Sequence, residues 1–305
     1  QNMSIYLPIA EMNVNVLLIV FIGMLVGSLS GLFGVGGGFL MTPLLIFLGI
    51  PPAVAVGTEA PHVLASSISG SIVHWRKKNI DIKIGIVLLT GGLVGSTIGV
   101  NIFKILMGFG QIDLIIQLLF LILLGFIGFS MLFESAKTTI KKYKTTSVIR
   151  TKLHQHSWIH GLPLKMRFHR SKLYISAIPP FLIGIVVGIL SAMMGIGGGF
   201  IMIPAMVYIL GMSTNVVVGT SLFQIIFVTA NSTFFQSYLN QTVDIVLASL
   251  MILGGVIGAQ IGARIGTSVK AEYLRGALAF IVLTVCLKIF LDLTLTPAEI
   301  FSLSN

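Results

Sequence analysis

Long apolar segments alternate with short polar ones along the chain. About 20 helical residues span the hydrocarbon core of a bilayer. Eight runs have about this length: residues 14–33, 53–75, 83–105, 112–133, 174–194, 214–238, 243–264 and 271–292. Two further runs, 39–50 and 200–211, are too short to cross alone and have the length typical of re-entrant or half-helix segments. The pattern predicts an all-α polytopic membrane protein.

The second half of this pattern repeats the first. Gly34–Phe39 reads G-V-G-G-G-F, and Gly195–Phe200 reads G-I-G-G-G-F, 161 residues later. Other matches are Pro43 with Pro204, Val56-Gly57-Thr58 with Val218-Gly219-Thr220, and the glycines 91, 92, 95 and 99 with 254, 255, 258 and 262. We therefore predict an internal duplication, which is common in secondary transporters. The expected parts are a first transmembrane repeat (1–133), a basic linker (134–172) and a second transmembrane repeat (173–305).

Charge placement favours an inverted topology for the two repeats. We take 14–33 with 39–50 as a hairpin that dips into the membrane at its G-G-G loop and returns, followed by three full crossings. This model puts 17 of the 19 Lys and Arg residues, the linker included, on one side. The positive-inside rule then makes the linker cytoplasmic and both termini periplasmic. If the short runs cross fully instead, the repeats become parallel and the basic loops divide between both sides; 14–33 is long enough to span.

Composition excludes several other classes of protein. The chain has 305 residues, of which 55% are hydrophobic and 9% are charged, with a mean hydropathy of +1.03. Soluble domains carry about 25% charged residues, so a soluble enzyme and a nucleic-acid partner are both excluded despite the net charge of +10. The single cysteine, Cys286, excludes an internal disulfide framework. We expect a multi-pass protein of the inner membrane, with membrane lipid as a partner.

The two glycine loops are the first candidate site. They contribute Gly36, Gly37 and Gly38 from one half and Gly197, Gly198 and Gly199 from the other. Glycines leave backbone N–H groups bare and allow a positive φ, so such a turn can form an anion-binding nest at the start of a helix. Two loops in an inverted repeat could face one another around a single anion. Alternatively, these glycines only allow a tightly packed hairpin.

A second candidate site follows each glycine loop. Glu59 and His62 are three residues apart and share a helix face, and Ser221 and Gln224 take their places in the second half. Ionisable groups inside a membrane are costly and indicate function, so Glu59 and His62 are candidates for proton coupling or gating. Alternatively, they lie at the wetted headgroup end of their helix. Neutral donors to a substrate would come from Thr58, Thr220, Ser221 and Gln224.

Two further patterns point to structure more than to chemistry. The glycine ladders 91/95/99 and 254/258/262 have the spacing that lets membrane helices approach closely. The linker holds four of the six histidines, His154, His156, His160 and His169. We interpret it as a solvated basic loop near anionic lipid, although His-x-His-x3-His could bind a metal. We expect no metal and no cofactor.

These motifs also resemble a known family, the TauE/SafE membrane proteins. The resemblance rests on G-L-F-G-V-G-G-G-F at 31–39, Pro43, Gly57-Thr58, His74-Trp75-Arg76 and Asn79-Ile80-Asp81, and it covers nearly the whole chain outside the linker. It implies a bacterial exporter of sulfite or an organosulfonate. Because the cytoplasm is electrically negative, an anion can leave without ion coupling, at about 2.3 kcal/mol per charge and 100 mV.

Other functions remain open beside export. The alternatives are a proton-coupled importer, which would use Glu59, or a channel for another small anion such as sulfate, thiosulfate or a carboxylate. An enzyme is not expected, because Gly27-Ser28-Leu29-Ser30-Gly31 has leucine where a G-x-S-x-G nucleophile would stand. The sequence leaves homo-oligomerisation open.

Overall fold

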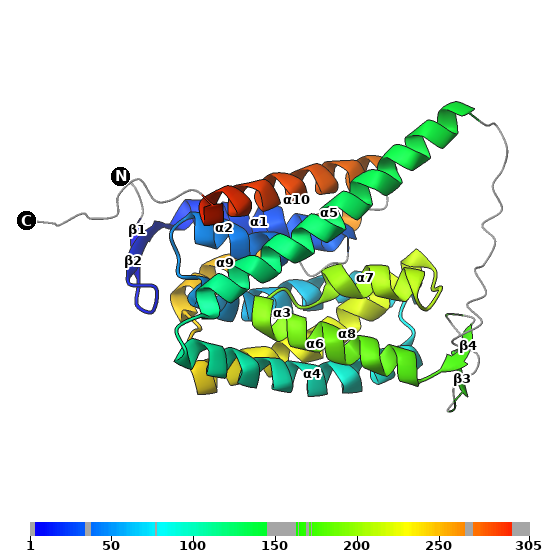
Figure 1. Cartoon of the computed structure of the whole chain (residues 1–305), viewed down its shortest axis with the longest axis horizontal. Helices are drawn as coiled ribbons and strands as arrows, with labels where there is room; N and C mark the ends of the chain where they lie inside the picture. Colours follow the sequence, from blue (N-terminus) through cyan, green and yellow to red (C-terminus); the bar gives the residue numbers. More distant parts are fainter. Residues whose placement is uncertain are drawn as a thin grey trace, which may run out of the picture. The chain divides into compact units, whose positions relative to one another are not determined.

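The computed structural model describes residues 4–33, 38–76, 78–144, 163, 165–168, 171, 173–265 and 271–294. Its helices are α1 (Val16–Phe33), α2 (Gly38–Phe47), α3 (Pro52–Arg76), α4 (Ile82–Gly108), α5 (Ile112–Lys144), α6 (Ile178–Met194), α7 (Gly199–Tyr208), α8 (Thr214–Phe235), α9 (Ile245–Ile265) and α10 (Ala271–Thr294). The strands are β1 (Ser4–Leu7), β2 (Met12–Asn15), β3 (Lys165–Phe168) and β4 (Leu173–Ser176), and a π-helical turn covers Gln236–Asn240 (Figure 1). Each predicted run corresponds to one helix, with α2 and α7 as the two short ones.

Five helical stretches among the described residues are long and apolar enough to cross a membrane. They are Val16–Phe33, Ile82–Gly108, Ile112–Ser130, Val216–Asn240 and Ile245–Ile265. The prediction of an all-α polytopic membrane protein is thereby confirmed. α3 has the length to cross, with 25 residues, but several of its buried positions are polar, which sets it apart from the apolar spans.

The chain forms two compact units. The first comprises residues 1–116 and 149–268 and holds both hairpins, the helices α1–α4 and α6–α9, and the start of α5. The second comprises residues 117–148 and 269–305, with the rest of α5 and α10. In the second unit the Cys286 thiol lies 3.5 Å from the carbonyl oxygen of Leu121, which joins α10 to α5.

A small β-hairpin precedes the first helix of each half, β1–β2 before α1 and β3–β4 before α6. Neither hairpin was predicted from the sequence. β1 pairs with β2 and β3 with β4, both antiparallel. The second hairpin follows the first by 161 residues, the same spacing as the glycine loops, and it begins inside the predicted linker. Leu7 and Phe168 are equivalent at this spacing, and both are fully buried.

The start of each first helix is capped by the residue that ends its hairpin. The side-chain oxygen of Asn15 accepts hydrogen bonds from the backbone N–H groups of Leu17 and Leu18, at 3.0 and 3.3 Å. The hydroxyl of Ser176 accepts one from Ile178 at 3.2 Å. Such caps satisfy backbone donors that a helix leaves free at its first turn. The hairpins therefore belong to the repeated unit.

Glycines bring α1 of the first half against α9 of the second. A Cβ at Gly23 would lie 2.9 Å from the carbonyl oxygen of Met251, and one at Gly27 would lie 2.7 Å from the Cα of Gly255. A Cβ at Gly31 would overlap the backbone of Ala259. Residue numbers rise together on both helices, so α1 and α9 run parallel with their backbones in contact.

The same contact recurs between α4 of the first half and α6 of the second. Gly91 and Gly95 face the backbone at Phe181 and Ile185, and a Cβ at Gly99 would lie 3.0 Å from the Cα of Ile189. These helices also run parallel and lie side by side (Figure 1). The predicted packing role of both glycine ladders is thus visible in the structure, where each ladder faces the first helix of the other half.

The central helices, α3 and α8, complete the first unit. Thr58 and Ser69 of α3 contact Thr242 and Val256 at α9, so α3 runs parallel to α9. Thr220 and Asn231 of α8 contact Asp81 and Ser96 at α4, so α8 runs parallel to α4. The first unit therefore contains two sets of parallel helices, α1 with α3 and α9, and α4 with α6 and α8.

We predict that Gly95→Ala destabilises the protein, because its Cβ would overlap the carbonyl oxygen of Ile185. Overpacking of this kind costs about 1–3 kcal/mol. Gly108→Ala, near the end of the same helix, is the matched control, since a Cβ there meets nothing within 4 Å. Thermal unfolding of purified protein in detergent should show a lower midpoint for Gly95→Ala alone; equal midpoints would contradict this packing.

Candidate functional site

A fully buried pair of ionisable side chains lies in the N-terminal half of α3. The Nδ1 atom of His62 is 2.9 Å from Oε1 of Glu59, and neither side chain is exposed. The other carboxylate oxygen, Oε2, and the other ring nitrogen, Nε2, have no hydrogen-bond partner in the structure. A buried ionisable pair with two unsatisfied atoms is costly, so this position is a candidate for function.

Glycines of both halves surround Glu59. A Cβ at Gly38, the first residue of α2, would lie 3.1 Å from the carboxylate oxygen Oε1. A Cβ at Gly195, which ends α6, would lie 3.2 Å from the Cβ of Glu59. Gly38 also lies beside Ile196 of the second loop. The predicted site residues Gly38 and Glu59 are thus brought together, whereas Gly36 and Gly37 lie outside the described residues.

The second glycine loop has the backbone conformation that requires glycine. Gly195, Gly197 and Gly198 have φ values of +73°, +69° and +80°. Gly198 is the N-cap of α7, whose first residue is Gly199, and it offers no side chain to the helix amides. The N-terminus of α7 therefore has the uncapped amides that favour an anion.

Two phenylalanine rings pack against each other where α2 and α7 begin. Phe39 and Phe200, which directly follow the glycines, stack with ring centroids 4.3 Å apart and an interplanar angle of 4°. Gly197 lies beside Val63 of α3 and Ile225 of α8, another pair of equivalent positions. The second loop therefore packs against α3 and α8 mainly through apolar contacts.

The equivalent place in the second half is neutral. Ser221 bonds the carbonyl oxygen of Val218 on its own helix, at 2.9 Å. Gln224 is fully buried, and its amide nitrogen and oxygen have no hydrogen-bond partner. Gln224 lies against Gly92 of α4, as His62 lies against Gly255 of α9. The absence of a side chain at these two glycines makes room for the two polar side chains.

Thr58 and Thr220 do not join this cluster but contact the opposite half. The Thr58 hydroxyl accepts a hydrogen bond from the N–H of Asp244 at 3.0 Å, and the Thr220 hydroxyl accepts one from Asp81 at 3.1 Å. The sequence interpretation gave the two aspartates no role. Their spacing of 163 residues, in Asn79-Ile80-Asp81 and Thr242-Val243-Asp244, was the signal that could have identified them.

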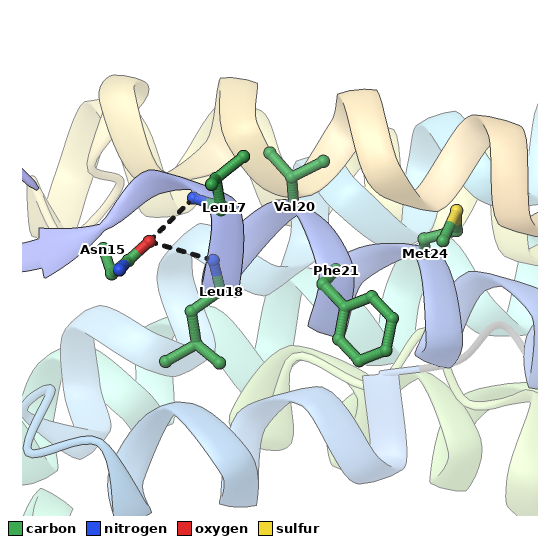
Figure 2. Close-up of a pocket in the computed structure, with 6 residues that line it drawn as sticks. All are labelled: Asn15, Leu17, Leu18, Val20, Phe21 and Met24. Carbon is green, nitrogen blue, oxygen red and sulfur yellow. Dashed lines mark hydrogen bonds between the residues drawn. The ribbon is translucent and has the colours of Figure 1, made fainter. Parts of the chain in front are cut away.

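A surface hollow of about 560 Å³ lies on α1, and neither the Glu59–His62 pair nor Gln224 lines it. Figure 2 shows its lining, which consists of Asn15, Leu17, Leu18, Val20, Phe21 and Met24. Asn15 already caps the helix, and the Leu17 side chain is 64% exposed. The hollow is therefore a mainly apolar surface of α1. Neither Glu59 nor His62 is among the residues that line it.

The predicted histidine cluster cannot be placed. His154, His156, His160 and His169 all lie outside the described residues.

The fold and the site define a multi-pass α-helical membrane protein with a Glu–His pair buried between two related halves. A family model described as "Sulfite exporter TauE/SafE" matches residues 19–289. The chain therefore belongs to the TauE/SafE family of membrane transporters, as its motifs indicated.

Curated relatives carry transporter names. "Probable membrane transporter protein YjnA" of Bacillus subtilis is 29% identical, over 89% of this chain and 98% of its own length. "Probable membrane transporter protein YunE" of the same organism is 27% identical, over 79% and 85%. "Sulfite exporter TauE/SafE family protein 3" of Arabidopsis thaliana is 30% identical, over 32% of this chain and 21% of its own. No solved structure matches the chain significantly.

We predict that His62→Gln lowers stability more than the double variant Glu59→Ser/His62→Gln. The single change leaves the Glu59 carboxyl group buried without its hydrogen-bond partner, and an unsatisfied buried polar group costs about 1–3 kcal/mol. The double variant copies the neutral Ser221–Gln224 pair of the second half and leaves no buried charge.

Thermal unfolding in detergent checks this order of stability. A double variant with the same midpoint as His62→Gln, or a lower one, would contradict the ion pair as the source of the loss.

Proposed function

We propose that the chain is a secondary transporter that exports a small sulfur-containing anion, such as sulfite or an organosulfonate, across the inner membrane. The observation that carries this proposal is the Glu59–His62 pair, buried in the centre of the first unit between glycines of both halves. The description of the family supports the choice of substrate.

We propose further that the two halves form an inverted repeat. Each half would be a re-entrant helix pair, α1–α2 or α6–α7, followed by three transmembrane helices. The parallel packing of α1 with α9 and of α4 with α6 supports this arrangement. The short connection between α3 and α4, residues 77–81, reverses the chain, so the first helices of the two halves would point in opposite directions.

In this proposal the anion binds near the glycine loops, at the start of α2 and α7. The amides of Gly36–Gly38 and Gly197–Gly199 would hold it, with Ser221 and Gln224 as neutral donors. Binding would require Phe39 and Phe200 to separate, because their stacked rings now occupy the space between the loops. Thr58 and Thr220 would act by positioning α3 and α8, since their hydroxyls already bond the opposite half.

Glu59 would carry a proton in step with the anion. Its carboxylate lies at the start of α2, so an ionised Glu59 would repel an anion there. A proton on Glu59 removes that repulsion, and His62 is placed to exchange the proton with it. This same pair favours one alternative, a proton-coupled importer of another small anion such as sulfate, thiosulfate or a carboxylate.

The orientation follows from the positive-inside rule. The basic residues of 134–172 would lie in the cytoplasm, and the hairpin β1–β2, near the N-terminus, would lie in the periplasm.

We predict that proteoliposomes containing the protein release radiolabelled sulfite in a saturable way that follows an imposed membrane potential. Gly198→Ala should lower this flux strongly, because φ is +80° there and a Cβ would meet Val187. Gly108→Ala serves as the matched control, since the space around it is open. Glu59→Gln should remove the dependence of the flux on an imposed pH gradient.

Competition with unlabelled sulfate, thiosulfate and organosulfonates then ranks the substrates. Flux that does not saturate and shows no counterflow would indicate a channel. Absence of flux for every one of these anions, at either sign of the potential, would contradict an anion exporter.

A further inference from the structure

Hydrogen bonds connect Thr58, Ile9 and Asp244 just before the start of α9. Asp244 donates its backbone N–H to the Thr58 hydroxyl at 3.0 Å. Its carboxylate oxygen Oδ2 accepts the N–H of Ile9, in the turn of the hairpin β1–β2, at 2.9 Å. Thr58 and Asp244 are fully buried. One residue of the second half thus ties together the hairpin and α3 of the first half; we call Thr58, Asp244 and Ile9 the first clasp.

The same arrangement occurs with the two halves exchanged. Asp81 donates its N–H to the Thr220 hydroxyl at 3.1 Å. Its Oδ2 accepts hydrogen bonds from the N–H and the hydroxyl of Ser171, in the turn of the hairpin β3–β4, at 2.9 and 2.6 Å. We call Thr220, Asp81 and Ser171 the second clasp. Here a residue of the first half ties together the hairpin and α8 of the second.

The two clasps lie at opposite ends of α3. Thr58 is near its N-terminus, whereas Asp81 follows its last residue, Arg76. The 19 residues from Thr58 to Arg76 rise about 27 Å in a helix, close to the thickness of a bilayer core. The clasps therefore belong to opposite faces of a spanning bundle.

Each clasp is also joined to the buried polar cluster. Thr58 directly precedes Glu59, and Thr220 directly precedes Ser221. A change at the cluster that moves α3 or α8 must therefore stretch the hydrogen bond of the neighbouring threonine. Gly57 and Gly219 allow this closeness, because a Cβ at either would meet the backbone of the opposite half, at Thr242 and Asn79 respectively.

The clasps differ physically from the glycine contacts between helix backbones. Those contacts have no space into which the helices can move. A clasp consists of a few polar bonds to a two-stranded hairpin, which is marginally stable by itself and depends on its partners for position. The bonds from Ile9 to Asp244 and from Ser171 to Asp81 are only partly buried, so their exchange for water is feasible.

We propose that the two clasps are the two gates of the transporter, with Asp244 and Asp81 as the residues that close them. Release of the first clasp opens the buried site to the face with β1–β2, and release of the second opens it to the face with β3–β4. This proposal rests on the proposed transport function, because it assigns control of access to residues outside the substrate site.

Accessibility of a buried cysteine tests the gates without any substrate. The reporter is Ser67→Cys in a Cys286→Ser background, since Ser67 is fully buried in α3 and its hydroxyl has no hydrogen-bond partner. A membrane-impermeant maleimide is applied to right-side-out and to inside-out vesicles. The test variants are Thr58→Val and Thr220→Val, which remove one hydroxyl each. Thr90→Val is the matched control, because the Thr90 hydroxyl is exposed and bonds only its own helix, at Val87.

Thr58→Val should speed labelling from the face with β1–β2 alone, and Thr220→Val from the face with β3–β4 alone. We expect roughly a three- to tenfold increase, which is the equilibrium shift that loss of one hydrogen bond produces. Thr90→Val should match the parent. Equal increases from both faces, or no increase from either, would overturn the proposal.

Asp244→Asn and Asp81→Asn are a second pair of variants, for use if a valine variant fails to fold as judged by size-exclusion chromatography. The same face-specific labelling is expected of them.

Failure of the gate proposal and failure of the proposed transport function are distinguishable. Face-specific labelling without sulfite flux would reject the substrate and keep the gates, whereas sulfite flux without face-specific labelling would reject the gates alone.

Discussion

The structure depends on two contacts in which helix backbones touch through glycine. Lipid is as apolar as the side chains, so membrane helices associate through close packing and polar contacts more than through hydrophobic burial. The seams between α1 and α9 and between α4 and α6 supply this packing. Each seam joins the first helix of one half to the fourth helix of the other, so neither half is complete alone. This crossed arrangement encloses α3 and α8 in the centre, and α3 and α8 carry the buried polar groups.

The comparison between the halves separates packing from function. Equivalent glycines, Gly92 and Gly255, make room for a polar side chain in both halves, but one side chain is Gln224 and the other is His62. The second half therefore holds a neutral pair where the first holds two ionisable side chains, so the fold itself does not require ionisable groups at this position. The ionisable pair is found in the half whose acid lies beside Gly38 and Gly195. That asymmetry supports a role for Glu59 and His62 in transport.

Much of the fold was predictable because membrane helices are specified by local hydrophobicity. The runs, the repeat and the broken helices at the glycine loops all follow from patterns within one segment. The hairpins were missed because strands of four residues carry little signal, and the second begins inside a basic stretch. The sequence indicated which polar residues are candidates for the site, but it did not indicate which residues they contact. Thr58 and Thr220 were expected to face a substrate, yet their partners, Asp244 and Asp81, come from the opposite half, and that pairing depends on tertiary structure alone.

In the proposed inverted repeat the two related halves face opposite sides of the membrane. The most direct test uses Asn13→Cys and Tyr174→Cys, which are exposed, equivalent positions of the two hairpins, each in a Cys286→Ser background. An impermeant maleimide is applied to intact cells and to inside-out vesicles. We expect Asn13→Cys to be labelled only from outside and Tyr174→Cys only from the cytoplasmic face. Labelling of both from the same face would mean parallel repeats and would overturn the inverted arrangement.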